Sequence, residues 1–208
     1  MTPEAEAFQR RFDVSRETTD RLEAYRQLLL RWNPKINLVS KSTLADAWTR
    51  HMVDSAQIFE LAPENARLWA DFGSGGGFPG AVVAIMALEK SPDMAITLVE
   101  SDQRKAAFLR TVIRETGAKA AVLARRVEQV DPLSANVVSA RALAPLTALL
   151  GFAETHMATG GTAIFPKGAT AEKEIAVALE SWRFDCEKIS SETDEGGLIL
   201  KIGDIERV

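Results

Sequence analysis

The sequence predicts an α/β protein with one doubly wound, mainly parallel sheet of seven strands, and three observations lead to that class. Short apolar runs alternate with amphipathic stretches after Pro63, and a glycine-rich segment follows the first run. The last two runs are joined by SSETDEGG, which is too short for a helical crossover. Strands that alternate with helices form a parallel sheet covered on both faces, whereas a short connection gives an antiparallel hairpin.

The expected strands are short apolar runs. They cover residues 67–72, 95–100, 119–124, 136–139, 161–166, 182–189 and 197–202. Helical patterns fall between the first six runs. We therefore expect a sheet that ends in a C-terminal antiparallel hairpin.

The residues ahead of the sheet have a helical pattern over 3–60. Five apolar residues recur there at helical spacing: Leu22, Tyr25, Leu28, Leu29 and Trp32. Pro34 is expected to end that helix. The sequence thus predicts an N-terminal helical extension over residues 1–62 and one compact domain over residues 63–208.

Composition excludes several classes of protein. Apolar residues make up 46% of the chain and charged residues 26%, as in a globular protein with a core. No apolar run approaches the ~20 residues that cross a bilayer, and the N-terminus lacks the pattern of a secretory signal. One cysteine, Cys186, and two histidines, His51 and His156, are too few for a disulfide framework or a multi-cysteine metal site. We expect a cytoplasmic protein with no metal.

The charge of the chain is distributed unevenly. The net charge is −4, but residues 168–208 hold five basic and ten acidic residues, so residues 1–167 carry +1. Over residues 101–141 there are eight basic residues and four acids. Composition alone favours a solvated charge pattern without a partner, yet a local basic face is compatible with an acidic protein.

The strongest local signal is a glycine-rich loop from Asp71 to Gly80, which reads DFGSGGGFPG. It follows an apolar strand and precedes a helical stretch, so it lies at the edge of the sheet where open α/β folds bind ligands. The helix behind it offers free N–H groups to a polar ligand. Gly75, Gly77 and Gly80 also fit the G-x-G-x-x-G pattern of dinucleotide sites, which is a weak signal by itself.

Two acidic residues narrow the choice of ligand. Asp71 ends the strand before the glycines. A carboxylate there can hold a cationic amino-acid group, through water or through the loop, but it offers no favourable interaction to an anionic pyrophosphate. Glu100 ends the second strand, where an acid accepts the ribose hydroxyls of an adenosine. The other interpretation of Glu100 is an acid at the start of the next helix.

Several further motifs are more particular than the glycine loop. WNPKINL occupies residues 32–38 and RHMVDS residues 50–55. The other pieces are GSGGGFPG (73–80), VES (99–101), RK (104–105), FL (108–109), RVE (126–128), SARA (139–142) and PKG (166–168). From about Trp32 to Lys201, the chain resembles the small-subunit ribosomal RNA guanine-N7 methyltransferases, once called the glucose-inhibited division protein B family.

This resemblance implies a class I, Rossmann-like methyltransferase fold that uses S-adenosylmethionine to methylate N7 of one guanine in 16S rRNA near the decoding region. It implies that Gly73, Phe78, Val127, Glu128 and Arg141 line the donor site, and that Arg126, Arg141 and Lys167 lie at the active face. Asp71, Gly75, Gly77 and Glu100 complete the expected donor site. The expected partner is 16S rRNA or the small ribosomal subunit, without membrane or DNA, and we expect a monomer.

Guanine N7 carries an in-plane lone pair and no proton, so its methylation needs alignment and exclusion of water rather than a general base. Positioning of this kind supplies up to about 7–11 kcal/mol. The sequence lacks the Asp/Asn-Pro-Pro-aromatic element of amino-group methyltransferases and the Pro-Cys nucleophile of pyrimidine C5 enzymes. His51 is therefore not expected to act as a base. Arg50 and His51 are expected to orient Asp54 or contact RNA, and packing is an equal alternative for His51.

Three charged residues keep two interpretations each. Arg141 binds guanine O6 or a phosphate, or it forms a salt bridge at the end of its strand. Lys167 attracts phosphate or is a solvated charge. Glu128 receives the adenine amino group or pairs with Arg126.

Among the aromatic residues, Phe78 on the glycine loop is the candidate for stacking on a base, whereas Trp32 and Trp48 are expected to pack between helices. Two other functions remain open. An NAD-dependent oxidoreductase would use the same glycine pattern, but the chain leaves no room for a substrate domain and shows no acid–base pair. A non-enzymatic RNA-binding module would not need the glycine loop with Asp71 and Glu100.

Overall fold

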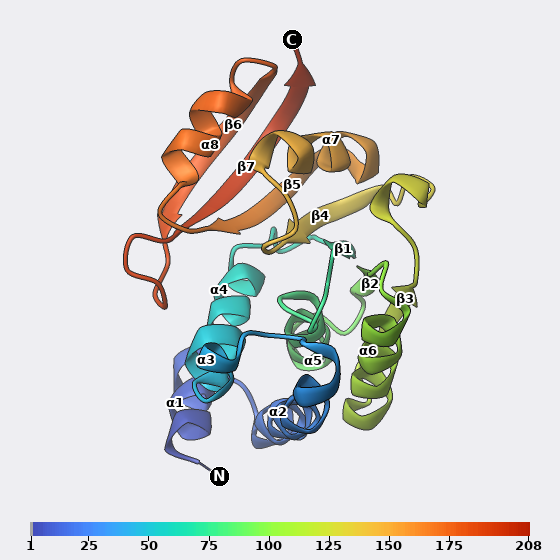
Figure 1. The fold of residues 1–208 in the computed structure, drawn as a ribbon, viewed down its shortest axis with the longest axis vertical. Helices are drawn as coiled ribbons and strands as arrows, with labels where there is room; N and C mark the ends of the chain where they lie inside the picture. The colour runs from blue at the N-terminus through green and yellow to red at the C-terminus, as the bar shows by residue number, and fades with distance from the viewer. Residues whose placement is uncertain (1) are drawn as a thin grey trace.

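The computed structural model describes residues 2–208, which form a seven-stranded sheet with helices on both faces (Figure 1). The strands lie in the order β3-β2-β1-β4-β5-β7-β6. Their bounds are β1 (Leu68–Phe72), β2 (Ala95–Val99), β3 (Ala120–Leu123), β4 (Ala135–Ala140), β5 (Met157–Lys167), β6 (Trp182–Ser190) and β7 (Leu198–Arg207). Each expected strand is confirmed, although β5 begins at Met157 rather than 161 and β7 continues to Arg207 rather than 202.

Strands β1 to β5 run parallel to one another. β7 lies between β5 and β6 and runs antiparallel to both, as the short connection between β6 and β7 predicts. The expected C-terminal hairpin is therefore confirmed. The parallel arrangement brings the carboxyl ends of β1, β2 and β4 to one edge of the sheet, and we call this the carboxyl edge.

The helices divide between the two faces of the sheet. One core joins the helices from α1 to α6 to side chains such as Trp69 and Leu98, and the second joins α7 and α8 to side chains such as Phe72 and Phe165. The helices are α1 (Pro3–Phe12), α2 (Arg16–Ile36), α3 (Lys41–Leu44), the π-helix η1 (Trp48–Val53), α4 (Asp54–Glu60), α5 (Gly80–Lys90), α6 (Gln103–Thr116), the 3-10 helix η2 (Val127–Gln129), α7 (Leu146–His156) and α8 (Ala171–Ala178).

Two expectations about helices are wrong. The segment between β3 and β4 contains only η2 and no α-helix. Pro132 there has no N–H to donate, and Ser134 adopts a positive φ of 49° that ends helical geometry. Pro34 lies inside α2 rather than at its end. The helix continues for two residues beyond Pro34, so the missing N–H removes one hydrogen bond in the last turn. The buried Asn33 side chain accepts hydrogen bonds from the N–H groups of Leu38 and Val39 and fixes the chain just beyond the helix.

The first helices share one hydrophobic core with the sheet. Phe8 and Phe12 of α1 and Tyr25 of α2 are buried in the same cluster as Trp69 of β1. Trp48 is buried as well, so its expected packing between helices is confirmed. The division of the chain at residues 62 and 63 stays a prediction. No helix within residues 2–208 is long and apolar enough to cross a membrane.

Candidate active site

The glycine loop connects β1 to α5 at the carboxyl edge. Gly73, Gly75 and Gly77 have positive φ angles of 61°, 56° and 94°, which residues with a Cβ rarely adopt. Gly80 is needed for a different reason, because a Cβ at that position would lie 2.6 Å from Asp71 Oδ2. The loop is thus specified by backbone geometry in its first part and by close helix–strand packing at its end.

The carboxylate of Asp71 is buried beneath the loop. Its Oδ1 accepts a hydrogen bond from Ser139 Oγ at 2.7 Å, and its Oδ2 accepts one from the Gly80 N–H at 3.3 Å. Burial raises the pKa of Asp71 to about 6, against the opposing effect of these hydrogen bonds. Because the side chain is fully buried and bonded to the loop, Asp71 holds the loop in place, and its role toward a ligand stays a prediction.

Glu100 follows β2 and holds the opposite side of the loop. Its Oε2 accepts a hydrogen bond from the Gly75 N–H at 2.8 Å, and its Oε1 accepts one from the Asp102 N–H at 2.7 Å. Asp102, rather than Glu100, caps α6, since its side chain accepts the N–H groups of Arg104 and Lys105. Glu100 nevertheless accepts the N–H of this N-cap residue, so its position at the helix start is compatible with the structure, and its contact with a ribose stays a prediction.

The ring of Phe78 is buried at 4% exposure, so it is not the base-stacking residue that the sequence suggested. Tyr25 stacks on it at 5.2 Å between ring centroids and His51 at 4.7 Å. The guanidinium of Arg141 lies 5.1 Å from the ring centre. Tyr25 also donates a hydrogen bond to the Gly76 carbonyl. Phe78 therefore couples the loop to the N-terminal helices, and its place in the donor site stays a prediction.

Arg141 follows β4 and contacts the N-terminal helices. Its Nη1 donates to Asp54 Oδ2 at 2.9 Å and to the Arg50 carbonyl at 3.3 Å, while Nη2 donates to His51 Nδ1 at 3.1 Å. The predicted salt bridge at the strand end is thus present. A guanidinium has five N–H groups. Nε–H and one Nη2–H therefore have no acceptor within residues 2–208.

The contacts of His51 fix its tautomer. Arg141 can only donate, so Nδ1 of His51 accepts and Nε2 carries the proton that is donated to Thr43 Oγ1 at 3.0 Å. Burial, together with the charges of Arg141 and Arg50, lowers the pKa of His51 to about 3. The imidazole is neutral near pH 7 and its lone pair is occupied, which agrees with the expectation that His51 is not a base.

Lys167 ends β5 and is not a solvated charge. Its side chain is only 9% exposed, and Nζ donates to Glu174 Oε2 at 2.8 Å and to the Ala144 carbonyl at 3.0 Å. Glu174 also accepts the Leu146 N–H. The charge expected to attract phosphate is therefore already neutralised, and Lys167 instead ties the loop after β4 to α8.

The segment after β3 places Arg126 and Glu128 on the surface and buries Val127 between them. Within residues 2–208 no ion pair joins Arg126 to Glu128, so that interpretation of Glu128 is wrong. Its role at the adenine end of a donor stays a prediction.

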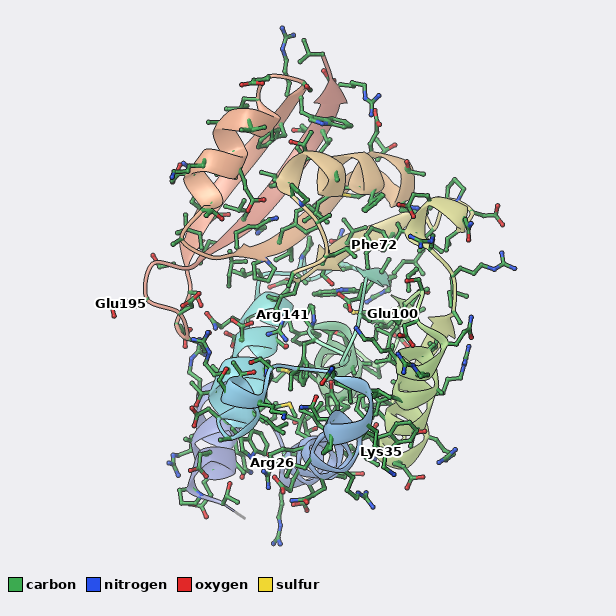
Figure 2. The ribbon with its side chains drawn as sticks, viewed as in Figure 1. Arg26, Lys35, Phe72, Glu100, Arg141 and Glu195 are labelled. Carbon is green, nitrogen blue, oxygen red and sulfur yellow. The ribbon has the colours of Figure 1, made fainter. Side chains whose placement is uncertain are left out.

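A cleft of about 730 Å³ opens beside Arg141. Figure 2 shows Arg141 beside α4 and Glu100 near the top of α6, at the edge of the sheet. The cleft is lined by Arg50, His51, Asp54, Arg141, Lys167 and Thr193, among others. Sequence analysis missed Thr193, because nothing in its local pattern indicates a contact with Asp54 139 residues away. Within residues 2–208 no cluster of three or more His, Cys, Asp or Glu side chains is placed to hold a metal ion.

Comparison with known proteins decides the family. A model of the family described as rRNA small subunit methyltransferase G matches residues 18–195. The chain belongs to this family. A relative from Ruegeria sp. (strain TM1040) is 55% identical over 94% of this chain and 95% of its own length. One from Ruegeria pomeroyi is 50% identical over the full length of both. Both are named ribosomal RNA small subunit methyltransferase G, and the resemblance found in the sequence motifs is confirmed.

Solved structures of more distant proteins share the fold. A methyltransferase from Geobacter sulfurreducens has a TM-score of 0.62 at 14% identity and covers 88% of each chain. M. jannaschii TYW2, in complex with AdoMet, has a TM-score of 0.58 at 13% identity, with 84% of this chain and 80% of that chain covered. The expected class I methyltransferase fold is confirmed.

Proposed function

We propose that the protein transfers the methyl group of S-adenosylmethionine to N7 of one guanine in 16S rRNA. Family membership supports this reaction, and the observation that carries the choice of N7 is the state of His51 and Arg141. The histidine at the mouth of the cleft has its lone pair occupied and its pKa held near 3. An acceptor that carries no proton suits a mouth whose histidine cannot act as a general base.

The residues at the glycine loop fit the methyl donor. The donor supplies an electrophilic methyl group on its sulfonium. Each carboxylate oxygen of Glu100 accepts one backbone N–H and keeps a second lone pair, which suits the hydroxyls of a ribose. The half-buried Gly73 and Gly75 bring the backbone of the loop to the place where the amino-acid end would bind, and Val127 and Glu128 would hold the adenine.

Arg141 is the group that would meet the acceptor. Its remaining Nε–H and Nη2–H groups suit guanine O6 or a phosphate oxygen. N7 itself must stay free of hydrogen bonds, so a fork shared between O6 and N7 does not fit the reaction. The stacking of the guanidinium on Phe78 and its salt bridge with Asp54 limit its motion, which favours alignment.

A second feature supports RNA as the substrate. Seven basic residues on or beside α2, α6 and β3 are exposed or half-buried and form no ion pair within residues 2–208: Arg31, Lys35, Lys105, Arg110, Lys119, Arg125 and Arg126. We call them the α6 flank; Figure 2 labels Lys35, which lies in the last turn of α2. Unpaired cations attract the phosphate backbone, so an acidic protein still binds RNA on one side. We further propose a cytoplasmic monomer acting on the small ribosomal subunit.

The test is mass mapping of methylated nucleosides in 16S rRNA from cells that lack the protein. We expect one N7-methylguanosine to disappear and to return when the wild-type protein is supplied. Calorimetry should show binding of S-adenosylmethionine and no binding of NAD. Unchanged methylation in the deleted cells would refute the proposed substrate, and NAD binding would reopen the oxidoreductase alternative.

A further inference from the structure

The tip of the β6–β7 hairpin, residues 191–197, contacts the N-terminal helices (Figure 1). The Arg50 guanidinium donates to the Thr193 carbonyl at 2.7 Å, and the Glu192 N–H donates to Gln57 Oε1 at 2.8 Å. Arg11 forms an ion pair with Glu192. A segment near the end of the chain is therefore fixed to helices from its beginning, and the contact forms one wall of the cleft.

Asp54 lies between the hairpin tip and Arg141. Its Oδ2 accepts from Arg141 Nη1 at 2.9 Å, and its Oδ1 accepts from Thr193 Oγ1 at 2.8 Å. The side chains of Arg141 and Asp54 are 19% and 13% exposed. Ser191 Oγ lies 3.1 Å from Thr193 Oγ1 and holds that hydroxyl from the other side.

We propose that Asp54 and Thr193 are positioning residues for Arg141, so that the hairpin tip sets the orientation of the guanidinium at the cleft. An ion pair alone limits the distance between two groups but leaves the carboxylate free to rotate. The Thr193 hydroxyl occupies the second oxygen of Asp54, and this fixes the plane in which Asp54 meets Arg141. The inference rests on the proposed function of Arg141 at the acceptor.

The same tip gives the acidic C-terminal segment a role. The Thr193 carbonyl accepts a hydrogen bond from the Arg50 guanidinium, and an Asp194 carboxylate oxygen lies 3.8 Å from the same guanidinium. Glu192 forms an ion pair with Arg11. Glu195 projects outward, away from these contacts (Figure 2). The tip therefore supplies acidic partners to the neighbouring Arg11 and Arg50, so these two cations compete less with Arg141 for an anionic or polar ligand.

The experiment compares Thr193→Val with Thr193→Ser, because both keep the size of the side chain close to that of threonine and only serine keeps the hydroxyl. Turnover is measured on the small-subunit substrate, with donor affinity by calorimetry and thermal unfolding as separate readouts. Thr193→Val should lower kcat/KM for RNA about tenfold, as expected for a lost hydrogen bond to a charged group, whereas Thr193→Ser should stay within about twofold. Asp54→Asn should cost about a hundredfold through misplacement of Arg141.

A second measurement separates positioning from a merely structural role. Thr193→Val is repeated in an Arg141→Ala background, where a positioning residue has nothing left to position. We expect no further loss of rate there, which is the non-additive result of a double-mutant cycle. An equal loss in both backgrounds, or full activity of Thr193→Val, would overturn the inference. Failure of the proposed function would look different, since the wild-type protein would then form no N7-methylguanosine.

Discussion

The two flanks of the carboxyl edge treat their cations in opposite ways. On the hairpin flank, each of four basic residues is paired with an acid: Arg11 with Glu192, Arg50 with Asp194, Arg141 with Asp54 and Lys167 with Glu174. On the α6 flank, residues such as Lys35 and Arg126 have no acidic partner within residues 2–208. Basic residues that cannot be told apart in the sequence thus differ in the structure, because some are paired with an acid and others are not.

The difference follows from electrostatics. Arg141 and Lys167 are largely buried and need a partner, because desolvation of an unpaired charge is costly. Arg11 and Arg50 are about two-fifths exposed, and for them pairing mainly fixes the position and weakens the field. An exposed, unpaired cation keeps its field and its mobility, which suits attraction of a phosphate backbone. We infer that the hairpin flank orients the acceptor and the α6 flank gathers the RNA.

The largest expected effect lies between the flanks, at the donor loop. Gly75→Val should reduce affinity for S-adenosylmethionine at least about a hundredfold, because a β-branched residue at φ of 56° forces the loop to change shape. RNA affinity should change little, since neither flank is touched. Calorimetry with the donor and a filter-binding assay with RNA measure the two effects.

Gly203→Val is the matched control for this substitution. Gly203 lies in β7, and a Cβ there would meet no atom within 4 Å. Its donor affinity should equal that of the wild-type protein. If folded Gly75→Val bound the donor normally, the assignment of the glycine loop would be wrong.

The next effect concerns the buried pair on the hairpin flank. Glu174→Ala leaves the Lys167 ammonium, 9% exposed, without its partner. The free energy of unfolding should fall by about 2–4 kcal/mol, somewhat less than for fully buried pairs because Glu174 is 24% exposed. Lys188→Ala removes an exposed pair with Glu172 and should cost only about 0–1 kcal/mol. Urea denaturation measures both, and equal losses would contradict the contrast between buried and exposed pairs.

Sequence analysis predicted the sheet well because hydrophobic periodicity and connection length are local signals. It also placed Asp71 and Glu100 at the loop, since strand ends and glycines mark the carboxyl edge. It misjudged Phe78 and Lys167 for one reason: their neighbours Tyr25, His51 and Glu174 come from elements that no local pattern relates to them. Burial of a residue beside a loop depends on how distant helices pack.

A third prediction corrects what the sequence suggested for Lys167. Arg126→Ala should lower the slope of log affinity against log salt by about 0.7–0.9, as expected for one lost phosphate contact. Lys167→Ala should leave that slope unchanged in the folded protein, because Glu174 already neutralises the charge. RNA binding at several salt concentrations measures the slope. A shallower slope for Lys167→Ala would show that Lys167 also contacts a phosphate, and the contrast between paired and unpaired basic residues would be wrong.

A fourth prediction is an absence of effect, and it concerns the pH dependence of the chemical step. The pKa of His51 lies near 3, so the ring stays neutral as the pH rises, and the pKa of Asp71 lies near 6. The single-turnover rate on saturating subunit substrate should therefore be nearly flat from about pH 7 to 9, without the ascending limb of a general base. Any loss of rate below about pH 6.5 should come from protonation of Asp71 beneath the loop and should be absent in Asp71→Asn.

His51→Ala makes this prediction decisive. The substitution removes a partner of Arg141 and a ring that stacks on Phe78, so it should lower the rate at every pH by a similar factor. Stability is affected in a pH-dependent way. Because the folded pKa of His51 is depressed below 6.5, neutral burial stabilises the protein above about pH 6.5, and this contribution declines as the pH falls toward 3.

Saturation with RNA prevents phosphate contacts from imitating a titration. An ascending limb between pH 7 and 9 that is present in the wild-type protein and missing in His51→Ala would show that His51 removes a proton. The acceptor would then carry a proton, and N7 of guanine would be the wrong atom.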